Sequence, residues 1–295
     1  MSKIINFHEI RDAIWFEKVV VYLKKKYRMI NVDQLYDYYY NGAKLHNACL
    51  ITVDDGHLSS FEIIYPILKK HNVSAIFFVS PQIIQRKEYV NFWFQEIADY
   101  DPKKVAKLFI EETASNYNTH FSLRSNLNKL SIDNLWKIIK AYQIKYNIPA
   151  KAPLNMNIEQ IQQIDREGLV EIGAHTMLHP FLANESDGRA AKEITESVVK
   201  LEKMLQHSIR AFAYPNGTPT KDFGKREICI LKETSVKLAF STYAREISKS
   251  DNKYAIPRYG LSCGSIGFIT IKLFLGKYYK PLMLFYKKVK SFLCF

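Results

Sequence analysis

The feature that most constrains this chain is an apolar run that ends in two adjacent carboxylates. The run begins with the triplet CLI at residues 49–51 and has the composition of a buried strand, and Asp54 and Asp55 follow at its end. Like charges at the end of a strand repel each other unless a cation, a proton or an arginine offsets them. Because successive side chains of a strand point to opposite faces, the two carboxylates can serve different purposes.

A second apolar run, at residues 73–79, predicts an α/β fold with a parallel sheet. A helical pattern at residues 59–71 lies between the two runs, and Pro66 should bend this helix or mark a boundary in it. The order strand, helix, strand predicts a right-handed crossover. Ligands of such sheets bind at the carboxyl ends of the strands, which is where Asp54 and Asp55 fall.

The remaining chain divides into predicted strands, predicted helices and an insertion. Further strands are expected at residues 3–7, 169–174, 209–213, 238–242 and 254–257, and further helices at residues 14–27, 31–40, 157–168 and 186–207. Residues 89–150 are rich in Lys, Asn and Tyr and contain no clear strand, so they predict an inserted helical lobe. We therefore expect one domain over residues 1–265, including the lobe of about 89–150, and a tail over 266–295.

The charge of +13 is concentrated at one end of the chain. No acidic residue follows Asp251, and the segment after it contributes +8. This local charge, without a recognised motif, argues against nucleic-acid binding. We expect a cytoplasmic protein, because the N-terminus lacks the apolar core of a signal peptide and no run reaches transmembrane length. We expect reduced thiols, because the four cysteines are scattered.

The tail suggests a basic amphipathic helix. At ~100° per residue, the lysines of residues 271–295 fall within an arc of about 160°, with apolar residues largely opposite. Two interpretations stay open: peripheral contact with an anionic membrane through residues 271–295, or a helix docked on the protein with a solvated lysine face. Pro281 interrupts the amphipathic pattern.

A second group of polar residues lies at residues 175–179, with the sequence HTMLH. The spacing of four predicts that His175 and His179 share one face of a helical turn, where both imidazoles can bind one ion. Two histidine nitrogens and one carboxylate form the ligand set of an open catalytic zinc site. Asp55 is the candidate carboxylate, because it also lies at the end of a strand.

Three segments together resemble the motifs of the polysaccharide deacetylase family, carbohydrate esterase family 4, which has the NodB homology domain. They are residues 52–56 (TVDDG), residues 175–180 (HTMLHP) and, less closely, residues 212–217 (FAYPNG). The resemblance covers most of residues 6–261. It implies a distorted (β/α)7-type barrel. It also implies hydrolysis of an N-acetyl group from an amino sugar. We expect the substrate to be an amino-sugar-containing glycan in the biosynthesis of envelope polysaccharides, or a lipid-linked glycan precursor if the tail contacts the membrane.

The resemblance also implies the roles of the polar residues. Asp55, His175 and His179 would bind a divalent metal, with zinc as the first candidate, and Asp54 would be the general base. A carboxylate suffices for this role because a metal lowers the pKa of its bound water to roughly 7.

Four further residues are the candidates for the substrate side of the site. A backbone N–H near Tyr214 and Pro215 would stabilise the oxyanion. His57 would line the groove, and Thr176 would fix the loop that carries the histidines by hydrogen bonding.

The chain departs from the family pattern at two points. Many members have an arginine in the third motif, which is absent here, and we predict that Arg258 replaces it and keeps Asp54 ionised. No histidine follows His207 to act as general acid, so we expect Asp54 to return its proton to the leaving amine, with His8 and His57 as weaker candidates. The alternative is a catalytically weak or inactive member of the fold that binds carbohydrate.

Overall fold

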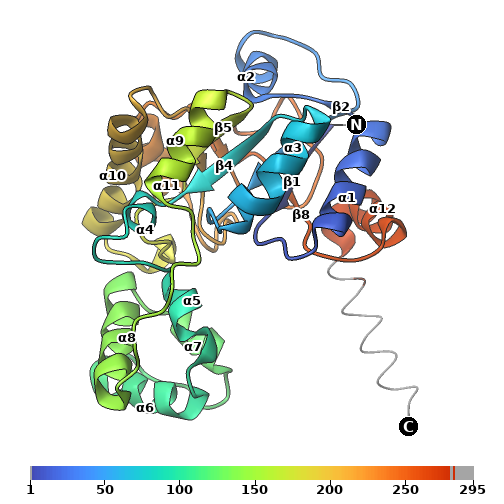
Figure 1. The fold of residues 1–295 in the computed structure, drawn as a ribbon. Helices are drawn as coiled ribbons and strands as arrows, with labels where there is room; N and C mark the ends of the chain where they lie inside the picture. The colour runs from blue at the N-terminus through green and yellow to red at the C-terminus, as the bar shows by residue number, and fades with distance from the viewer. Residues whose placement is uncertain (1, 280–281, 283–295) are drawn as a thin grey trace.

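The computed structural model of the protein describes residues 2–279 and 282, and shows a parallel sheet curled into a half-barrel with helices around it (Figure 1). The strands are β1 (Lys3–Phe7), β2 (Arg28–Met29), β3 (Ala48–Val53), β4 (Ala75–Val79), β5 (Val170–Ala174), β6 (Ala211–Ala213), β7 (Leu238–Phe240) and β8 (Tyr259–Gly260). Their order is β7-β6-β5-β4-β3-β1-β8, with β2 paired to β3. All pairs are parallel, so the predicted barrel-type α/β fold is confirmed.

Both faces of the sheet are buried, in two separate apolar clusters. Ile4, Leu50 and Phe78 belong to the cluster on one face, while their neighbours Ile5 and Ile51 belong to the cluster on the other. This alternation follows from the two-residue period of a strand. A parallel sheet covered by helices needs apolar residues on both faces, and this explains why the strands read as continuous apolar runs.

The helices of the barrel follow the predicted pattern closely. They are α1 (Ala13–Lys26), α2 (Val32–Tyr40), α3 (Tyr65–His71), α4 (Pro81–Ile84), α9 (Ile158–Glu167), α10 (Asp187–Leu205), α11 (Lys225–Lys232) and α12 (Ile266–Leu275). A π-helical turn (Ser60–Ile64) precedes α3, so the boundary predicted near Pro66 is confirmed. Helices α4 and α11 and strands β2 and β8 were not predicted.

The last strand after β7 lies at a different position from the one predicted. The strand predicted at residues 254–257 is wrong: only Ile256 forms a bridge, to Phe240, and the named strand is β8. Pro257 has no N–H and therefore cannot extend a ladder of hydrogen bonds. The segment between β7 and β8 carries Arg258, which is fully buried.

A group of helices between β4 and α9 extends from the end of the barrel (Figure 1). It contains α5 (Trp93–Glu96), α6 (Pro102–Glu112), α7 (Leu123–Leu127) and α8 (Ile132–Tyr146). These helices have their own apolar cluster, which also takes in Met177, Leu178 and Phe181 from the segment after β5. The lobe therefore packs directly on the segment that carries the two histidines.

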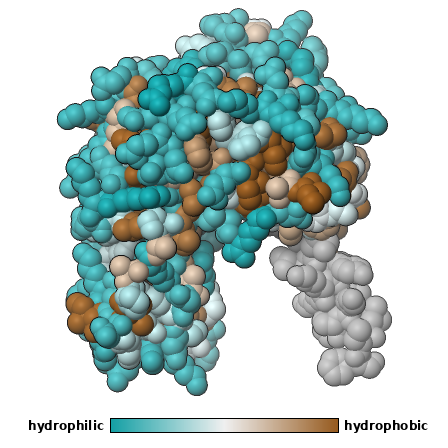
Figure 2. Space-filling model, in the orientation of Figure 1, coloured by the Kyte–Doolittle hydropathy of each residue, from teal (hydrophilic) through white to brown (hydrophobic). Residues whose placement is uncertain are grey.

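Helix α12 lies beside α1, and a 3-10 turn (Gly276–Tyr278) follows it (Figure 1). Most of the predicted amphipathic tail, at residues 280–281 and 283–295, lies outside the described residues. No helix among those that the structure describes is long and apolar enough to cross a membrane. In Figure 2 the visible face of the barrel and lobe is mainly hydrophilic, with apolar residues in separate patches.

Candidate active site

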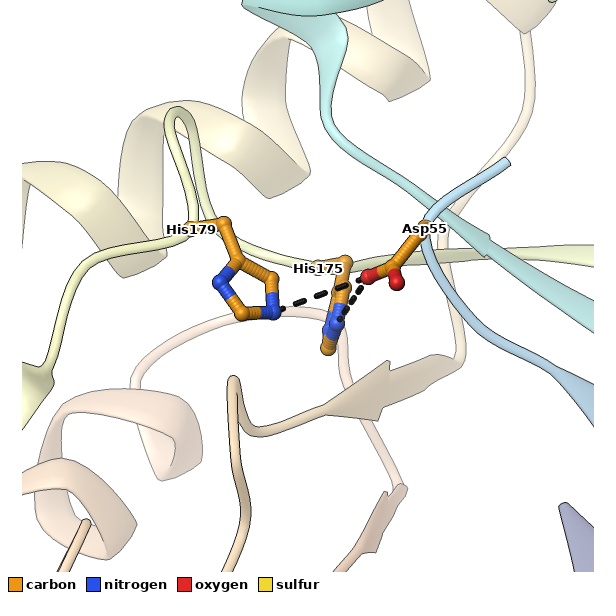
Figure 3. Close-up of side chains that lie close together, drawn as sticks. All are labelled: Asp55, His175 and His179. Carbon is orange, nitrogen blue, oxygen red and sulfur yellow. Dashed lines mark ion pairs between the residues drawn. The ribbon is translucent and has the colours of Figure 1, made fainter. Parts of the chain in front are cut away.

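The structure brings Asp55, His175 and His179 together at the carboxyl ends of β3 and β5 (Figure 3). Asp55 Oδ1 lies 3.4 Å from His175 Nε2 and 3.6 Å from His179 Nε2, and one ligand atom of each residue lies within 4.8 Å of the others. Asp55 follows β3 with a φ of 70°, and Gly56 next to it has a φ of 62°. This left-handed turn directs the Asp55 carboxylate across the strand ends toward the histidines.

The donor atoms of this triad fit a divalent metal. His175 Nδ1 lies 2.7 Å from the carbonyl oxygen of Ala213, which orients the ring so that Nε2 faces Asp55. Among the described residues, Asp55 Oδ1 is buried without a hydrogen bond. Burial lowers the pKa of His179 to about 4, so its imidazole is neutral at neutral pH, which is the form that binds a metal. An unsatisfied buried oxygen beside two imidazole nitrogens is the arrangement that a cation stabilises.

Asp54 has a separate environment inside the barrel. Its two carboxylate oxygens accept hydrogen bonds from Arg258 at 2.7 and 2.9 Å, and Asn6 Nδ2 donates a third at 3.0 Å. Burial alone would raise the pKa of Asp54, but the guanidinium of Arg258 outweighs this effect and holds the pKa below its usual value. Asp54 is therefore an ionised carboxylate at neutral pH.

Arg258 is itself fixed on every side. Its Nε donates to the carbonyl oxygen of Ser241 at 3.0 Å, and Nη1 also donates to Thr52 Oγ1 and Asn6 Oδ1 at 3.1 and 3.2 Å. The guanidinium lies over the rings of Phe78 and Phe240. The structure thus places the arginine singled out in the sequence directly against the candidate base.

The segment that carries the histidines is not the helical turn that the spacing of four suggested. Residues 175–180 have no helical structure, and Thr176 and His179 have φ values of 62° and 58°. The Thr176 hydroxyl donates to the carbonyl oxygen of His175 and accepts the N–H of His179 at 3.0 Å. The prediction of a helical turn was therefore wrong, because these local hydrogen bonds hold a loop instead; the loop still directs both imidazoles to Asp55.

Glu193 on α10 supports this loop, a role that was not predicted from the sequence. Its Oε2 accepts the N–H groups of Met177 and Leu178, both at 3.0 Å, and Arg189 lies 3.3 Å from Oε1. Burial raises the pKa of Glu193 to about 7. The available signal was an acidic residue on the inward face of a predicted amphipathic helix, next to the apolar Ile194.

The four residues predicted on the substrate side of the site differ in burial and in their hydrogen bonds. Thr176 and Tyr214 are buried, and the Tyr214 hydroxyl donates to the carbonyl oxygen of Tyr254 at 2.9 Å. The N–H of Tyr214 donates to the carbonyl oxygen of Phe240 at 3.2 Å, and Pro215 has none to donate, so neither residue supplies the oxyanion donor in this arrangement. His57 is half-buried, and its Nδ1 is hydrogen-bonded to Ser59 Oγ at 2.9 Å.

His8 is the histidine that comes nearest to the candidate base. It follows β1 directly, its Nε2 lies 3.8 Å from Asp54 Oδ2, and its side chain is 52% exposed. The lobe contacts the triad at His179. The rings of Phe92 and Phe94 pack against the His179 ring, with centroid distances of 5.5 and 5.1 Å. Trp93 Nε1 also donates to the carbonyl oxygen of His179 at 3.1 Å. The triad therefore lies between a half-exposed histidine and the lobe.

The fold and this site point to a class: hydrolases that combine a (β/α)7-type barrel with polar residues at its strand ends, here a candidate Asp-His-His metal site. The family model described as polysaccharide deacetylase matches residues 42–237. The chain belongs to the polysaccharide deacetylase family, whose members are hydrolases acting on carbon–nitrogen bonds.

Solved structures share this fold at low sequence identity. IcaB from Ammonifex degensii is 20% identical, with a TM-score of 0.60, over 88% of this chain and 91% of that chain. The Streptococcus pyogenes deacetylase PplD, in complex with acetate, is 15% identical, with a TM-score of 0.58 over the same shares. A de-N-acetylase from Aggregatibacter actinomycetemcomitans is 15% identical, with a TM-score of 0.58, over 91% of this chain and 98% of that chain. No curated protein matches the sequence.

Proposed function

We propose that this protein removes an N-acetyl group from an amino-sugar-containing glycan by metal-dependent hydrolysis. One observation supports the proposal: two adjacent ionised carboxylates have different hydrogen-bonding environments. Asp54 is saturated by Arg258 and Asn6, whereas Asp55 Oδ1 faces two imidazoles without a hydrogen bond among the described residues. The first arrangement suits a general base and the second a metal ligand.

The residues of the chain divide the reaction among them. A divalent metal held by Asp55, His175 and His179, with zinc as our first candidate, would polarise the acetamide carbonyl and lower the pKa of the attacking water. Asp54 accepts the proton of that water, because Arg258 keeps its carboxylate ionised. The hydroxyl oxygen forms the new bond to the carbonyl carbon, and the carbon–nitrogen bond then breaks, releasing acetate and the amine.

The leaving nitrogen needs a proton, and we propose His8 as its donor. The sequence alone favoured Asp54 returning the proton, but the His8 side chain is half-exposed and its Nε2 is 3.8 Å from Asp54 Oδ2. A half-exposed imidazole can collect a proton from solvent and present it to a substrate above Asp54. Proton return by Asp54 remains the alternative, and His8→Ala separates the two.

Acetate release tests the proposal directly. The wild-type protein, loaded with zinc, should release acetate from N-acetylated glucosamine oligosaccharides, and Asp54→Asn should abolish release while still binding zinc. The rival function is a carbohydrate-binding protein of the same fold without turnover. Zinc binding together with oligosaccharide binding, but no acetate from any acceptor, would establish the rival.

We propose further that the end of the chain contacts an anionic membrane, where a cytoplasmic enzyme would meet a lipid-linked glycan precursor. In the described part, Ile271, Phe274 and Tyr278 are exposed large apolar residues of α12 and the turn after it. No acidic residue follows Asp251 in the sequence. Apolar side chains in a basic segment suit an anionic lipid surface. Flotation with phosphatidylglycerol liposomes should be lost when residues 271–295 are removed, and equal flotation of the two proteins would contradict the contact.

A further inference from the structure

A cavity of about 700 Å³ lies between α1, α12 and the segment that joins β7 to β8. Helix α1 contributes Tyr22 and Lys26 to its lining, helix α12 contributes Leu273 and Phe274, and the joining segment contributes Arg245. Figure 1 shows α1 and α12 side by side, on the part of the barrel away from the helical lobe. We call this space the α12 cavity. Its volume falls within the range of roughly 300–1,000 Å³ typical of small-molecule pockets.

The α12 cavity is separate from the candidate active site. Lys3, at the start of β1, lines the cavity, whereas the triad lies at the opposite, carboxyl ends of the strands. At about 3.3 Å per residue, the Cα atoms of Lys3 and Phe7, the first and last residues of β1, are roughly 13 Å apart. A ligand in this cavity therefore does not occupy the place of a substrate at the triad, and the proposed deacetylase reaction gives the cavity no role.

The lining of the cavity is mainly aromatic and aliphatic. Leu273 and Tyr259 are buried, whereas Phe274 is 88% exposed. The Tyr22 hydroxyl is hydrogen-bonded to Thr270 Oγ1 at 2.8 Å, which joins α1 to α12 beside the cavity. An apolar chain in the cavity would cover the exposed ring of Phe274, and the removal of this apolar surface from water would favour binding.

The charged side chains of the lining have a positive balance. Three cationic side chains, those of Lys3, Lys26 and Arg245, line the cavity with the carboxylate of Glu246. Lys3 Nζ is already paired with Glu246 Oε1 at 2.5 Å, and Arg245 bonds both carboxylate oxygens of Asp251 at 2.8 and 3.1 Å. Lys26 is exposed and has no ion pair with any residue that the structure describes. Lys26 is therefore the side chain that can receive an anion from outside.

We propose that the α12 cavity binds an anionic amphiphile, a molecule with an apolar chain and a phosphate head. The chain lies against Leu273 and Phe274, and the phosphate pairs with the ammonium group of Lys26. The end of this protein's own chain suits the cavity less well, because no acidic residue follows Asp251 and its lysines would meet the cations of the lining. A cavity takes up single molecules, whereas a membrane surface is bound by an exposed helix face, so we infer that the amphiphile enters as a dissolved monomer.

Calorimetry on the full chain with dodecyl phosphate below its micelle concentration tests the site, with chelator present so that no metal at the triad binds the phosphate. Wild type should bind, and Lys26→Glu and Phe274→Asp should each weaken binding by about tenfold or more. Lys25→Glu and Ile271→Asp are the matched controls and should stay within roughly threefold of wild type. Lys25 is also exposed in the last turn of α1, Ile271 is 56% exposed on α12, and neither lines the cavity.

Several results would overturn the site. They are no binding of dodecyl phosphate to wild type, an equal loss in the variants and their controls, and equal affinity for the uncharged dodecyl maltoside. Binding to phosphatidylglycerol liposomes without binding of the dissolved amphiphile would also overturn it, and would assign the contact to a membrane surface. Binding that appears only after residues 283–295 are removed would identify the end of the chain as the occupant instead.

The result is independent of the proposed function, because binding is measured without acetate release. A wild type that binds dodecyl phosphate as expected but releases no acetate supports the α12 cavity and contradicts the deacetylase proposal. Where acetate is released, saturating dodecyl phosphate should leave the KM for the glycan unchanged, because the two sites lie at opposite ends of β1. Competitive inhibition would place the amphiphile at the triad and overturn the α12 cavity as its site.

Discussion

Replacing Arg258 by methionine tests the electrostatic basis of the site most directly. Methionine fills a similar volume but leaves the buried Asp54 carboxylate without its cation. Five hydrogen bonds donated by Arg258 are lost, two of them to Asp54. Removing one partner of a buried ion pair typically costs about 3–5 kcal/mol. We expect the free energy of unfolding at pH 7 to fall by this amount.

The loss should depend on pH in a defined direction. In wild type the pKa of Asp54 is held below its usual value of 3.8, so its contribution to stability is present above that pH and lost only under more acidic conditions. Without Arg258, burial raises the pKa of Asp54, and stability is then lost as the pH rises above 3.8. The difference between wild type and Arg258→Met should therefore be larger at pH 7 than at pH 4.

Urea unfolding followed by tryptophan fluorescence, with chelator present, measures this difference at both pH values. The double variant Arg258→Met, Asp54→Asn is the matched control, because no unpaired charge remains buried in it. It should recover about 2 kcal/mol relative to Arg258→Met at pH 7. A loss of stability that is the same at pH 4 and pH 7, and is not relieved in the double variant, would refute the ion pair as the reason.

Four further predictions concern the residues around the triad. His8→Ala should lower kcat by about 10²–10⁴-fold while the zinc affinity measured by calorimetry stays unchanged; an unchanged kcat would favour proton return by Asp54. Zinc at 100 times its Kd should raise the free energy of unfolding of wild type by about 2.7 kcal/mol but not that of Asp55→Ala, and equal stabilisation would contradict the site. Glu193→Ala should cost about 1–3 kcal/mol of unfolding free energy, because two N–H groups lose their acceptor, and should weaken zinc binding. Since burial raises the pKa of Glu193 to about 7, wild type should lose stability between pH 5 and pH 8, and Glu193→Gln should show less of this loss in urea unfolding.

The barrel was predictable because its signals are local in the sequence. Continuous apolar runs at β3 and β4, and the helical pattern between them, require a parallel sheet with both faces covered, and the structure has this arrangement. The end of the barrel was less predictable. The apolar residues around Ile256 resemble a strand, but Pro257 interrupts the ladder, and only the pairing with Phe240 in three dimensions shows where the strand is broken.

In the site, too, some features were predictable from the local sequence, whereas others depend on tertiary contacts. Asp54 and Asp55 meet different partners because Asp55, with a φ of 70°, already belongs to the turn after the strand, which Gly56 continues. The loop between His175 and His179 does not follow from sequence, because the local hydrogen bonds of Thr176 are accompanied by others that the fold supplies. Glu193 supplies two of these from a helix that lies later in the chain.

The hydrogen bonds of Asp54 and Asp55 distinguish the proposed base from the proposed metal ligand, which the motif alone does not. Arg258 and Asn6 satisfy both oxygens of Asp54, so Asp54→Asn weakens the pairing with Arg258 but alters none of the three candidate metal ligands, and the metal site should survive. Asp55 Oδ1 has no such partner in the described part of the chain, so Asp55→Asn removes the charge that would offset a divalent cation. The first variant should therefore bind zinc without turnover, and the second should lose zinc and turnover together. Loss of zinc binding in both variants would mean that Asp54 is itself a ligand and that the division between the two residues is wrong.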